Sequence, residues 1–323
     1  MRSEAIINAV NINEIQKNNR EKAKENFSVP VIVVDGDEDY EQHNWIMKIV
    51  RIPIVFLLNM LPISVGKKIF TAFSGHKGDT KTVRRWATTY KALEIMYSYP
   101  ERCKKGETTK VDFFWECFLS NAKSIRNRLT LTKRELLIAI RDVKKRKASV
   151  NLNLISLGSG SARAVIETLA QLDGLSPVQA KLVDMSRKAI SFSQELAASC
   201  NVINQIEWHR DYAQNLERYC SNGFQPDIVE MVGLLDYYPY DQAVDLITKI
   251  WEVLPNGGWL ITCNIRDNFE RPFVTKSINW PMIYRPPQEL ADILLEAGFL
   301  KENIKVVYEP LKIHGLAIAQ KIA

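Results

Sequence analysis

The chain has 323 residues, of which 46% are hydrophobic and 25% are charged, as is ordinary for a globular protein of one or two domains. No internal repeat or low-complexity tract is present, which excludes a fibrous or largely disordered chain. The formal net charge of +6 is uneven, because residues 1–150 carry +11 and residues 151–323 carry −5. A basic half can bind nucleic acid or anionic lipid, but we favour a solvated helical surface.

The first residues of the chain and its cysteines indicate a cytoplasmic protein. Residues 1–28 are polar and lack the apolar core of a signal peptide, so we expect a mobile or loosely docked arm. Five scattered cysteines form no CxxC pair and do not neighbour a histidine at metal-ligand spacing. We therefore predict reduced thiols and no metal site.

Residues 46–66 form the most apolar stretch of the sequence. Its longest uncharged run, residues 52–66, is shorter than the ~20 residues of a spanning helix, and it contains Pro53 and Pro62. We expect a buried or partner-facing segment. Flanking basic residues, among them Lys48 and Arg51, keep contact with a membrane surface as a second interpretation.

Residues 42–147 read mainly as helices, and we assign residues 29–148 to a helical N-terminal or lid domain. Apolar residues recur at helical spacing within residues 81–99 and again within residues 111–131. The Thr132…Glu135 spacing resembles a capping box and predicts that a helix begins there. The basic run at residues 144–147 is typical of a helix C-terminus.

From residue 151 short apolar runs alternate with helical runs, and we assign residues 149–323 to a second domain. Strands are expected at 151–157, 178–185, 204–211, 226–235, 257–265, 303–310 and 314–322. This alternation predicts an α/β fold with a mostly parallel sheet covered by helices on both faces. The last two strands follow one another directly, which predicts a terminal antiparallel hairpin.

A Gly-Ser-Gly-Ser turn follows the first of these strands. Gly158 and Gly160 lie where a backbone without Cβ atoms, next to a helix N-terminus, can approach a ligand. The dinucleotide fingerprint GxGxxG requires a third glycine at position 163, where this chain has Arg163. A GxGxG pattern requires glycine at 162, where the chain has Ala162.

Two aspartates end the next two strands. Asp184 is placed to accept hydrogen bonds from the ribose hydroxyls of an adenosine group, with an N-cap role for Asp184 or Ser186 as the alternative. Asp211 could accept a hydrogen bond from an adenine amino group, with Tyr212 beside it. An N-cap is an equally good interpretation of Asp211.

Residues 151–323 resemble a class I S-adenosylmethionine-dependent methyltransferase. The segments LGSGSA, VDMS, HRDY and LPNGGWLITCNI occur in the order of that family, and HGLAIAQKI fits its reversed last strand. The resemblance implies a Rossmann-like sheet and S-adenosylmethionine as cofactor. It implies a cofactor site that consists of Gly158, Ser159, Gly160, Asp184, Met185, Asp211, Tyr212 and Gly233. Ser156 and Ala162 depart from the pattern, since they stand where an acidic residue and a glycine are frequent.

A narrower resemblance covers residues 231–290. The segment that starts MVGLLDYYPYDQ and the later WPMIYRPPQEL are similar to a bacterial group that includes enzymes making the methyl ester of a 3-hydroxy fatty acid. Because the group has many members, this narrower resemblance does not identify the acceptor.

The acceptor is expected over the ends of the fourth and fifth strands of the sheet. A carboxylate acceptor needs orientation by a cation or an amide, and a hydroxyl or amine acceptor benefits from a nearby base. We predict Asp236, Tyr237 and Arg266 as catalytic residues. The predicted substrate-binding residues are Tyr238, Asn264, Arg271 and Tyr284.

The leading functional hypothesis is therefore methyl transfer to a small molecule by in-line displacement. A degenerate fold that acts as a binding or scaffold protein is an alternative, as is a nucleic-acid methyltransferase, for which the basic half gives weak support. Nicotinamide-dependent oxidoreduction is disfavoured by Arg163. A homodimer is compatible with the sequence.

Overall fold

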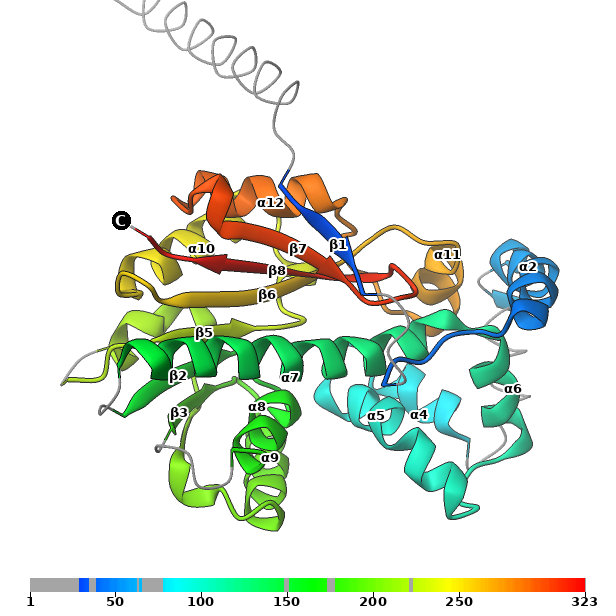
Figure 1. Cartoon of the computed structure of the whole chain (residues 1–323). Coiled ribbons are helices and arrows are strands. Elements are labelled where there is room, and N and C mark those ends of the chain that lie inside the picture. The colour runs from blue at the N-terminus through cyan, green and yellow to red at the C-terminus, as the bar shows by residue number, and fades with distance from the viewer. Residues whose placement is uncertain are drawn as a thin grey trace, which may run out of the picture.

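The computed structural model describes residues 29–34, 39–62, 64–65, 78–147, 151–172, 178–220 and 223–322. An eight-stranded sheet with helices on both faces forms the larger part of the molecule, and a group of helices lies beyond one end of its strands (Figure 1). The expected arm at residues 1–28 lies outside the described residues.

The strand order is β1-β7-β8-β6-β5-β2-β3-β4. The strands are β1 (Val31–Val33), β2 (Leu152–Leu157), β3 (Val178–Val183), β4 (Ile206–His209), β5 (Ile228–Met231), β6 (Trp259–Ile265), β7 (Ile304–Tyr308) and β8 (His314–Gln320). β8 runs antiparallel to both of its neighbours, β6 and β7, and the other pairs are parallel. The predicted parallel sheet and terminal antiparallel hairpin are thus confirmed.

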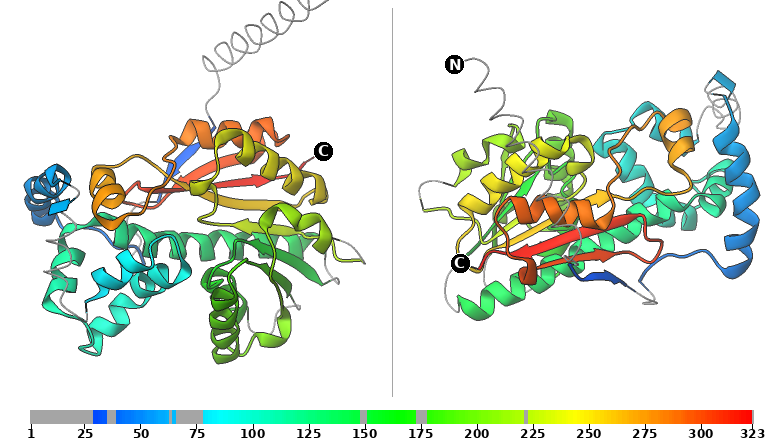
Figure 2. Two further views of the ribbon diagram at one scale, coloured as in Figure 1. Left: turned by 180° about the vertical axis from the view of Figure 1, so that it is seen from behind. Right: turned by 90° about the horizontal axis from the view of Figure 1, so that it is seen from above.

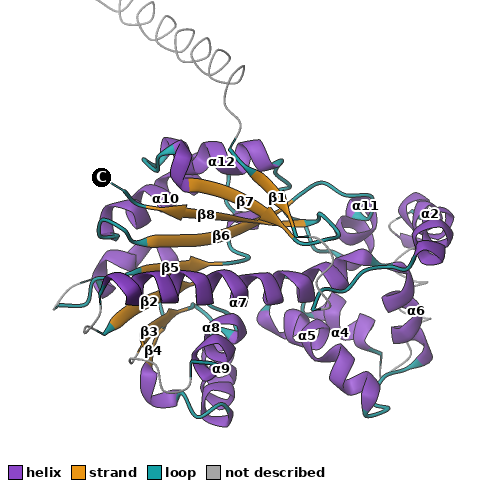
Figure 3. Ribbon diagram, in the orientation of Figure 1, coloured by secondary structure: helices purple, strands orange, loops and turns teal. Residues whose placement is uncertain are grey.

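Helices cover both faces of the sheet (Figure 3). The α-helices are α2 (Trp45–Met60), α4 (Asp79–Arg85), α5 (Tyr90–Lys104), α6 (Lys110–Phe118), α7 (Ser120–Arg146), α8 (Arg163–Ala170), α9 (Arg187–Ser199), α10 (Tyr240–Val253), α11 (Arg271–Phe273) and α12 (Pro287–Glu296). Short 3-10 turns are η1 (Ile203–Gln205), η2 (Ala213–Tyr219), η3 (Leu235–Tyr237) and η5 (Lys301–Asn303), and η4 (Val274–Ile278) is one turn of π-helix.

Successive side chains along a strand point to opposite faces of the sheet, and each face packs into its own hydrophobic core. On β2, Leu154 packs into the core formed with α7, α8 and α9, whereas the next residue, Ile155, packs into the core formed with α10, α12 and η2. Because both faces of the strand are buried, β2 reads as a nearly continuous apolar run.

Helix α7 extends further than its sequence suggests. The capping-box prediction at Thr132 is wrong, because α7 runs unbroken from Ser120 to Arg146 and the Thr132 hydroxyl donates to the carbonyl of Arg128, one turn earlier. The segment contains no proline or glycine, and its apolar period continues through Leu131, so nothing interrupts the helix. The basic run does end α7, as predicted.

The first strand was not predicted. β1 comes from the N-terminal part of the chain and pairs with β7, so it forms an edge of the sheet. The predicted boundary at residues 148/149 falls just after α7, whose buried Ile140 and Val143 pack into the same core as Leu154 of β2. The division of the chain into domains stays a prediction.

The apolar stretch from residue 46 forms helix α2, which lies along the outer side of the molecule (Figure 2). Val55 is fully buried, but Trp45, Ile49 and Leu57 are each more than half exposed. Burial is therefore restricted to a narrow strip of α2, and the partner-facing and membrane-surface interpretations stay predictions. Among the described residues, none of the helices combines the length and apolarity that crossing a bilayer requires.

Candidate functional site

The strand order reverses between β2 and β5, and such a switch point opens a crevice at the carboxyl ends of parallel strands. A cavity of about 230 Å³ occupies this position, here called the glycine-turn cavity. Its walls come from the turn after β2, the segments after β3 and β5, the start of α5 and the middle of α7. The helices that lie beyond the strand ends in Figure 1 therefore cover it.

The turn after β2 has the backbone that its glycines suggest. Gly158 and Gly160 have φ values of +60° and +56°, and Ala162 has φ +52°. Ala162 thus adopts the left-handed conformation in which glycine is normally found, so the departure from the family pattern changes the residue and keeps the backbone. A Cβ at Gly160 would lie 3.6 Å from Cβ of Tyr90, an ordinary van der Waals contact, so the backbone conformation and not a lack of space favours glycine there.

Asp184 fixes this turn from the end of β3. Its Oδ2 accepts a hydrogen bond from the Gly160 amide at 2.8 Å, and its Oδ1 accepts one from the Ser186 amide at 2.7 Å. The N-cap of α9 is Ser186, whose hydroxyl accepts from the Ala189 amide. Asp184 is therefore not the cap, and its carboxylate lines the cavity with remaining acceptor capacity.

A buried cation and a buried carboxyl group line the same cavity. Arg128 on α7 is 4% exposed, and Glu230 on β5 is 6% exposed. Neither forms an ion pair with a described residue: Arg128 donates only a long bond of 3.4 Å to the Tyr97 hydroxyl, and its Nε is unpartnered. Burial raises the pKa of Glu230 to about 7, because no cation lies close enough to stabilise its charge fully.

Glu230 also accounts for the second departure from the family pattern. Ser156 is its direct neighbour across the β2–β5 pair, and the Ser156 hydroxyl donates to Oε2 of Glu230 at 2.5 Å. The other carboxyl oxygen accepts from the Val232 amide. A carboxyl group therefore stands beside Ser156 and is supplied by the adjacent strand.

The remaining wall is formed by the segment after β5. Gly233 has φ +89°, and a Cβ there would lie 3.3 Å from Nη1 of Arg128, so the glycine lets the guanidinium approach the backbone. Tyr237 lines the cavity, and its hydroxyl accepts a hydrogen bond from Trp280 Nε1 at 2.7 Å. Burial of that hydroxyl raises the pKa of Tyr237 to about 12, so it is a hydrogen-bonding group at neutral pH.

The structure brings together five of the eight predicted cofactor residues, namely Gly158, Ser159, Gly160, Asp184 and Gly233. Met185 and Tyr212 are exposed and lie outside the cavity wall. Asp211 accepts hydrogen bonds from the Tyr212 amide, Asn215, Tyr219 and Arg218. The bonds from Asn215, Tyr219 and Tyr212 hold the pKa of Asp211 at about 2 and order the η2 segment.

Three predicted acceptor residues belong to a buried network at the end of β6. The Asp236 carboxylate accepts from the Ile265 amide at 2.7 Å, and the Asn264 amide oxygen accepts from Arg285 at 2.7 Å. Arg285 is 1% exposed and also donates to the carbonyls of Leu235 and Tyr238. Asp236, Tyr238 and Asn264 thus shape the strand end and do not line the glycine-turn cavity.

Three other predicted acceptor residues lie outside the cavity wall, two of them exposed and the third, Tyr284, half-buried. Arg266 is exposed, and Arg271 pairs with Asp267 and stacks over the Tyr284 ring at 4.6 Å. None of Arg266, Arg271 and Tyr284 lines the cavity, so Tyr237 alone of the predicted catalytic and substrate-binding residues does so.

Sequence reasoning missed Glu230 as a site residue, and it gave Arg128 only as one of two arginines, with Arg126, near the domain junction that could bind an anionic group. Glu230 had a signal, since it is the one charged residue in the apolar run IVEMV. The sequence around Arg128 does not distinguish it from the exposed basic residues of α7. The nearby Arg126 is paired with Glu41 and Glu116. Arg163, at the position of the missing glycine, pairs with Glu94 and so ties α8 to α5. The described residues contain no group of three or more side chains that could hold a metal ion.

Several solved structures are similar to this chain. A Bordetella parapertussis protein described as a possible exported protein aligns with a TM-score of 0.60 at 15% identity, over 87% of this chain and 100% of that one. An O-methyltransferase family protein from Burkholderia thailandensis aligns with a TM-score of 0.48 at 13% identity, over 74% of this chain and 62% of that one. Human N-acetylserotonin methyltransferase, solved in complex with SAM, gives a TM-score of 0.43 at 14% identity, over 72% and 58%.

A search of curated proteins found no match. A family model described as "Putative methyltransferase" matches residues 97–321, which include the whole of α7, every strand except β1, and the whole turn after β2. That match covers well over half of the sequence. The chain therefore belongs to this methyltransferase family.

Proposed function

We propose that the protein transfers a methyl group from S-adenosylmethionine to a small-molecule acceptor, and that the glycine-turn cavity holds the donor. The observation that carries the proposal is the pair of oppositely charged groups, Arg128 and Glu230, buried in one cavity without ion-pair partners among the described residues. A buried charge without a partner is costly, so a ligand that supplies both opposite charges fits this cavity.

The methionyl end of the donor has that combination of charges. Its carboxylate would pair with the guanidinium of Arg128, which is protonated at all relevant pH values. Its ammonium would pair with Glu230, close to the turn at Gly158 and Gly160. A dinucleotide carries phosphates and no ammonium group, so a buried carboxyl group beside the turn disfavours it.

The adenosine end would lie towards β3. Asp184 keeps acceptor capacity for ribose hydroxyls while it holds the Gly160 amide. Met185 and Tyr212 are exposed apolar side chains next to this end, and we propose that they flank the adenine ring. Asp211 would then act on the adenine only indirectly, because it accepts a hydrogen bond from the Tyr212 amide and so fixes the position of Tyr212.

S-adenosylmethionine supplies an electrophilic methyl group on a sulfonium. In the transfer the carbon–sulfur bond breaks, the sulfur keeps the electron pair, and a new bond forms between the methyl carbon and an oxygen or nitrogen of the acceptor. A carboxylate becomes an ester without losing a proton, whereas a hydroxyl or amine must release one. Tyr237 is the chain's own polar group best placed to orient the acceptor, because it lines the cavity and is itself held by Trp280.

Calorimetric titration with S-adenosylmethionine, its demethylated product and NAD⁺ tests the donor assignment. We expect both sulfur compounds to bind and NAD⁺ not to bind. Arg128→Met should weaken binding by roughly thirtyfold or more, since removal of one partner of a buried charge pair costs about 2–5 kcal/mol. Arg141→Met, an exposed position on the same helix, is the matched control and should leave binding unchanged.

Binding of NAD⁺ alone would contradict the proposal, and so would equal affinities in the wild type and Arg128→Met. The acceptor class has a separate test. Incubation with methyl-labelled donor and cell extract, followed by fractionation, should place the label in small molecules. Label confined to RNA, DNA or protein would refute a small-molecule acceptor while leaving donor binding intact.

A further inference from the structure

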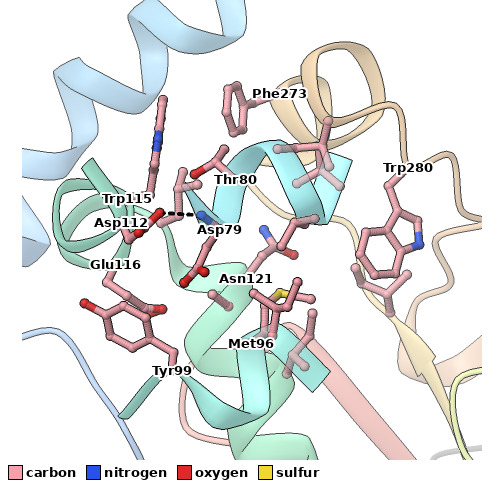
Figure 4. A pocket seen from close by; sticks show the side chains of 18 of the residues that line it. Asp79, Thr80, Met96, Tyr99, Asp112, Trp115, Glu116, Asn121, Phe273 and Trp280 are labelled. Atoms are coloured by element: carbon pink, nitrogen blue, oxygen red, sulfur yellow. Dashed lines mark hydrogen bonds between the residues drawn. The ribbon is translucent and has the colours of Figure 1, made fainter. Parts of the chain in front are cut away.

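A second cavity, of about 120 Å³, lies beside the first and is here called the apolar cavity. Its wall combines α4, α5, α6 and the start of α7 with the segment that follows β6 (Figure 4). Phe273 and Trp280 come from that segment, while Tyr99 and Trp115 come from α5 and α6. Trp280 borders both cavities, so the two spaces are adjacent.

Aromatic and aliphatic side chains dominate the wall. Trp115 and Phe273 stack with ring centroids 5.6 Å apart, and they share a buried cluster with Val274, Ile278 and Trp280. An apolar space of this size is close to the 150 Å³ of an engineered apolar cavity that binds benzene. A six-membered ring or a short branched alkyl group is thus of the right size.

The charged side chains on this wall are already occupied within the protein. Asp79 pairs with Arg102, and Glu116 pairs with Arg126. Asp112 accepts hydrogen bonds from the Asp79 amide, the contact drawn as a dashed line in Figure 4, and from the first turn of its own helix. The described wall contains neither lysine nor arginine, so it offers an anionic group no positive charge.

His314, the first residue of β8, is different. It lines the apolar cavity, is 2% exposed, and neither of its ring nitrogens has a hydrogen-bond partner among the described residues. Burial and the positive charge of Arg128 lower the pKa of His314 well below its ordinary value, so the ring is neutral. A neutral imidazole offers one donor and one acceptor, and both are unused.

The position of His314 relates it to the reaction edge of the sheet. Because β8 is antiparallel to β6, its first residue pairs with Ile265, the last residue of β6. His314 therefore stands at the edge where β2 and β5 end and where the glycine-turn cavity opens.

We propose that the apolar cavity is the acceptor pocket, and that it takes the uncharged, apolar part of an acceptor that carries a hydroxyl group hydrogen-bonded to His314. The proposal rests on the methyl-transfer function proposed above. It assigns His314 a role in acceptor recognition and specificity, and no role in donor binding.

Phenol and benzene are probes of the cavity that differ by the one hydroxyl group. Titrations monitored by NMR on the full chain should show phenol binding about tenfold more tightly than benzene, the effect of one buried hydrogen bond. His314→Leu should still bind benzene and should lose the preference for phenol. His209→Leu removes another histidine, at the end of β4 and outside the walls of both cavities, and should keep the preference.

Ala122 also lines the apolar cavity, so Ala122→Leu should reduce the affinity for both probes alike, and this variant serves if His314→Leu fails to fold. Equal affinities of the wild type for phenol and benzene, failure of both to bind, or an unchanged preference in His314→Leu would overturn the role of His314. An Ala122→Leu variant that binds both probes as the wild type does would overturn the cavity as their site.

Two further measurements separate this inference from the proposed function. S-adenosylmethionine affinity should be the same in wild type, His314→Leu and Ala122→Leu. If the wild type does not bind the donor, the proposed function fails even where the phenol preference is observed. If it does bind, phenol should suppress labelling of the small-molecule product in cell extract, and undiminished labelling would overturn the acceptor assignment alone.

Discussion

Glu230 should make the folded protein less stable as the pH rises, and its replacement by glutamine should remove that pH dependence. Burial raises its pKa from an ordinary 4.5 to about 7. Below pH 4.5 the carboxyl group is protonated in both the folded and the unfolded chain. Between pH 4.5 and 7 the unfolded chain releases the proton while the folded chain retains it, so the free energy of unfolding falls over this interval.

The size of the effect follows from the two pKa values. A difference between 4.5 and about 7 corresponds to about 3 kcal/mol of lost stability once the pH exceeds 7. Glu230→Gln keeps the shape, an acceptor for the Val232 amide and an NH2 group that can donate to the Ser156 hydroxyl, but it cannot ionise. The variant should therefore gain about 3 kcal/mol at pH 8 and about 1 kcal/mol at pH 5.5.

Urea denaturation at pH 5.5 and pH 8, without donor, measures this difference. Glu217→Gln, at an exposed position, is the matched control and should change stability little at either pH. The reasoning is refuted if Glu230→Gln gains the same amount at both pH values, or if it is less stable than wild type at pH 8. Donor affinity should fall in the same variant, because the carboxylate proposed for the ammonium is gone.

Three other substitutions address the turn and the strand end. Ala162→Gly should raise the melting temperature by the equivalent of about 1 kcal/mol, since φ is +52° there; a lower melting temperature would show that the turn is not strained. Asp184→Ala should weaken donor binding at least about tenfold in calorimetry, because it loses both the ribose acceptor and the bond that holds the turn; unchanged affinity would contradict that. Arg285→Leu leaves the Leu235 carbonyl and the Asn264 amide oxygen without their donor. It should lower the free energy of unfolding in urea by about 3 kcal/mol, and a loss below about 1 kcal/mol would contradict this.

The sheet was predictable because each of its strands after β1 is a local apolar run, and helical periods separate most of them. β1 escaped prediction for a topological reason: it lies about 270 residues before its partner β7, and the three residues of the strand give no periodic signal. The false helix start at Thr132 has a local reason, because a Thr-x-x-Glu spacing also arises inside a continuous helix.

The site was predictable where function depends on the backbone. Glycines and a strand-end carboxylate leave a pattern in a single segment, as Gly158, Gly160 and Asp184 do. Arg128 and Glu230 act through burial, and burial depends on which helix covers which strand end. The predicted catalytic residue Asp236 shows the converse, since a carboxylate next to the right strand end is used to hold the Ile265 amide.

The continuity of α7 determines how the molecule can move. Its 27 residues form one rod of about 40 Å, with one half packed on the sheet and the other half in the walls of both cavities. A hinge between the helical and sheet parts would have to break this rod, so the two parts should move as one body. The short link between α4 and α5 also borders the glycine-turn cavity, and there Thr88 has a left-handed conformation, φ +67°, that is unfavourable for a β-branched residue.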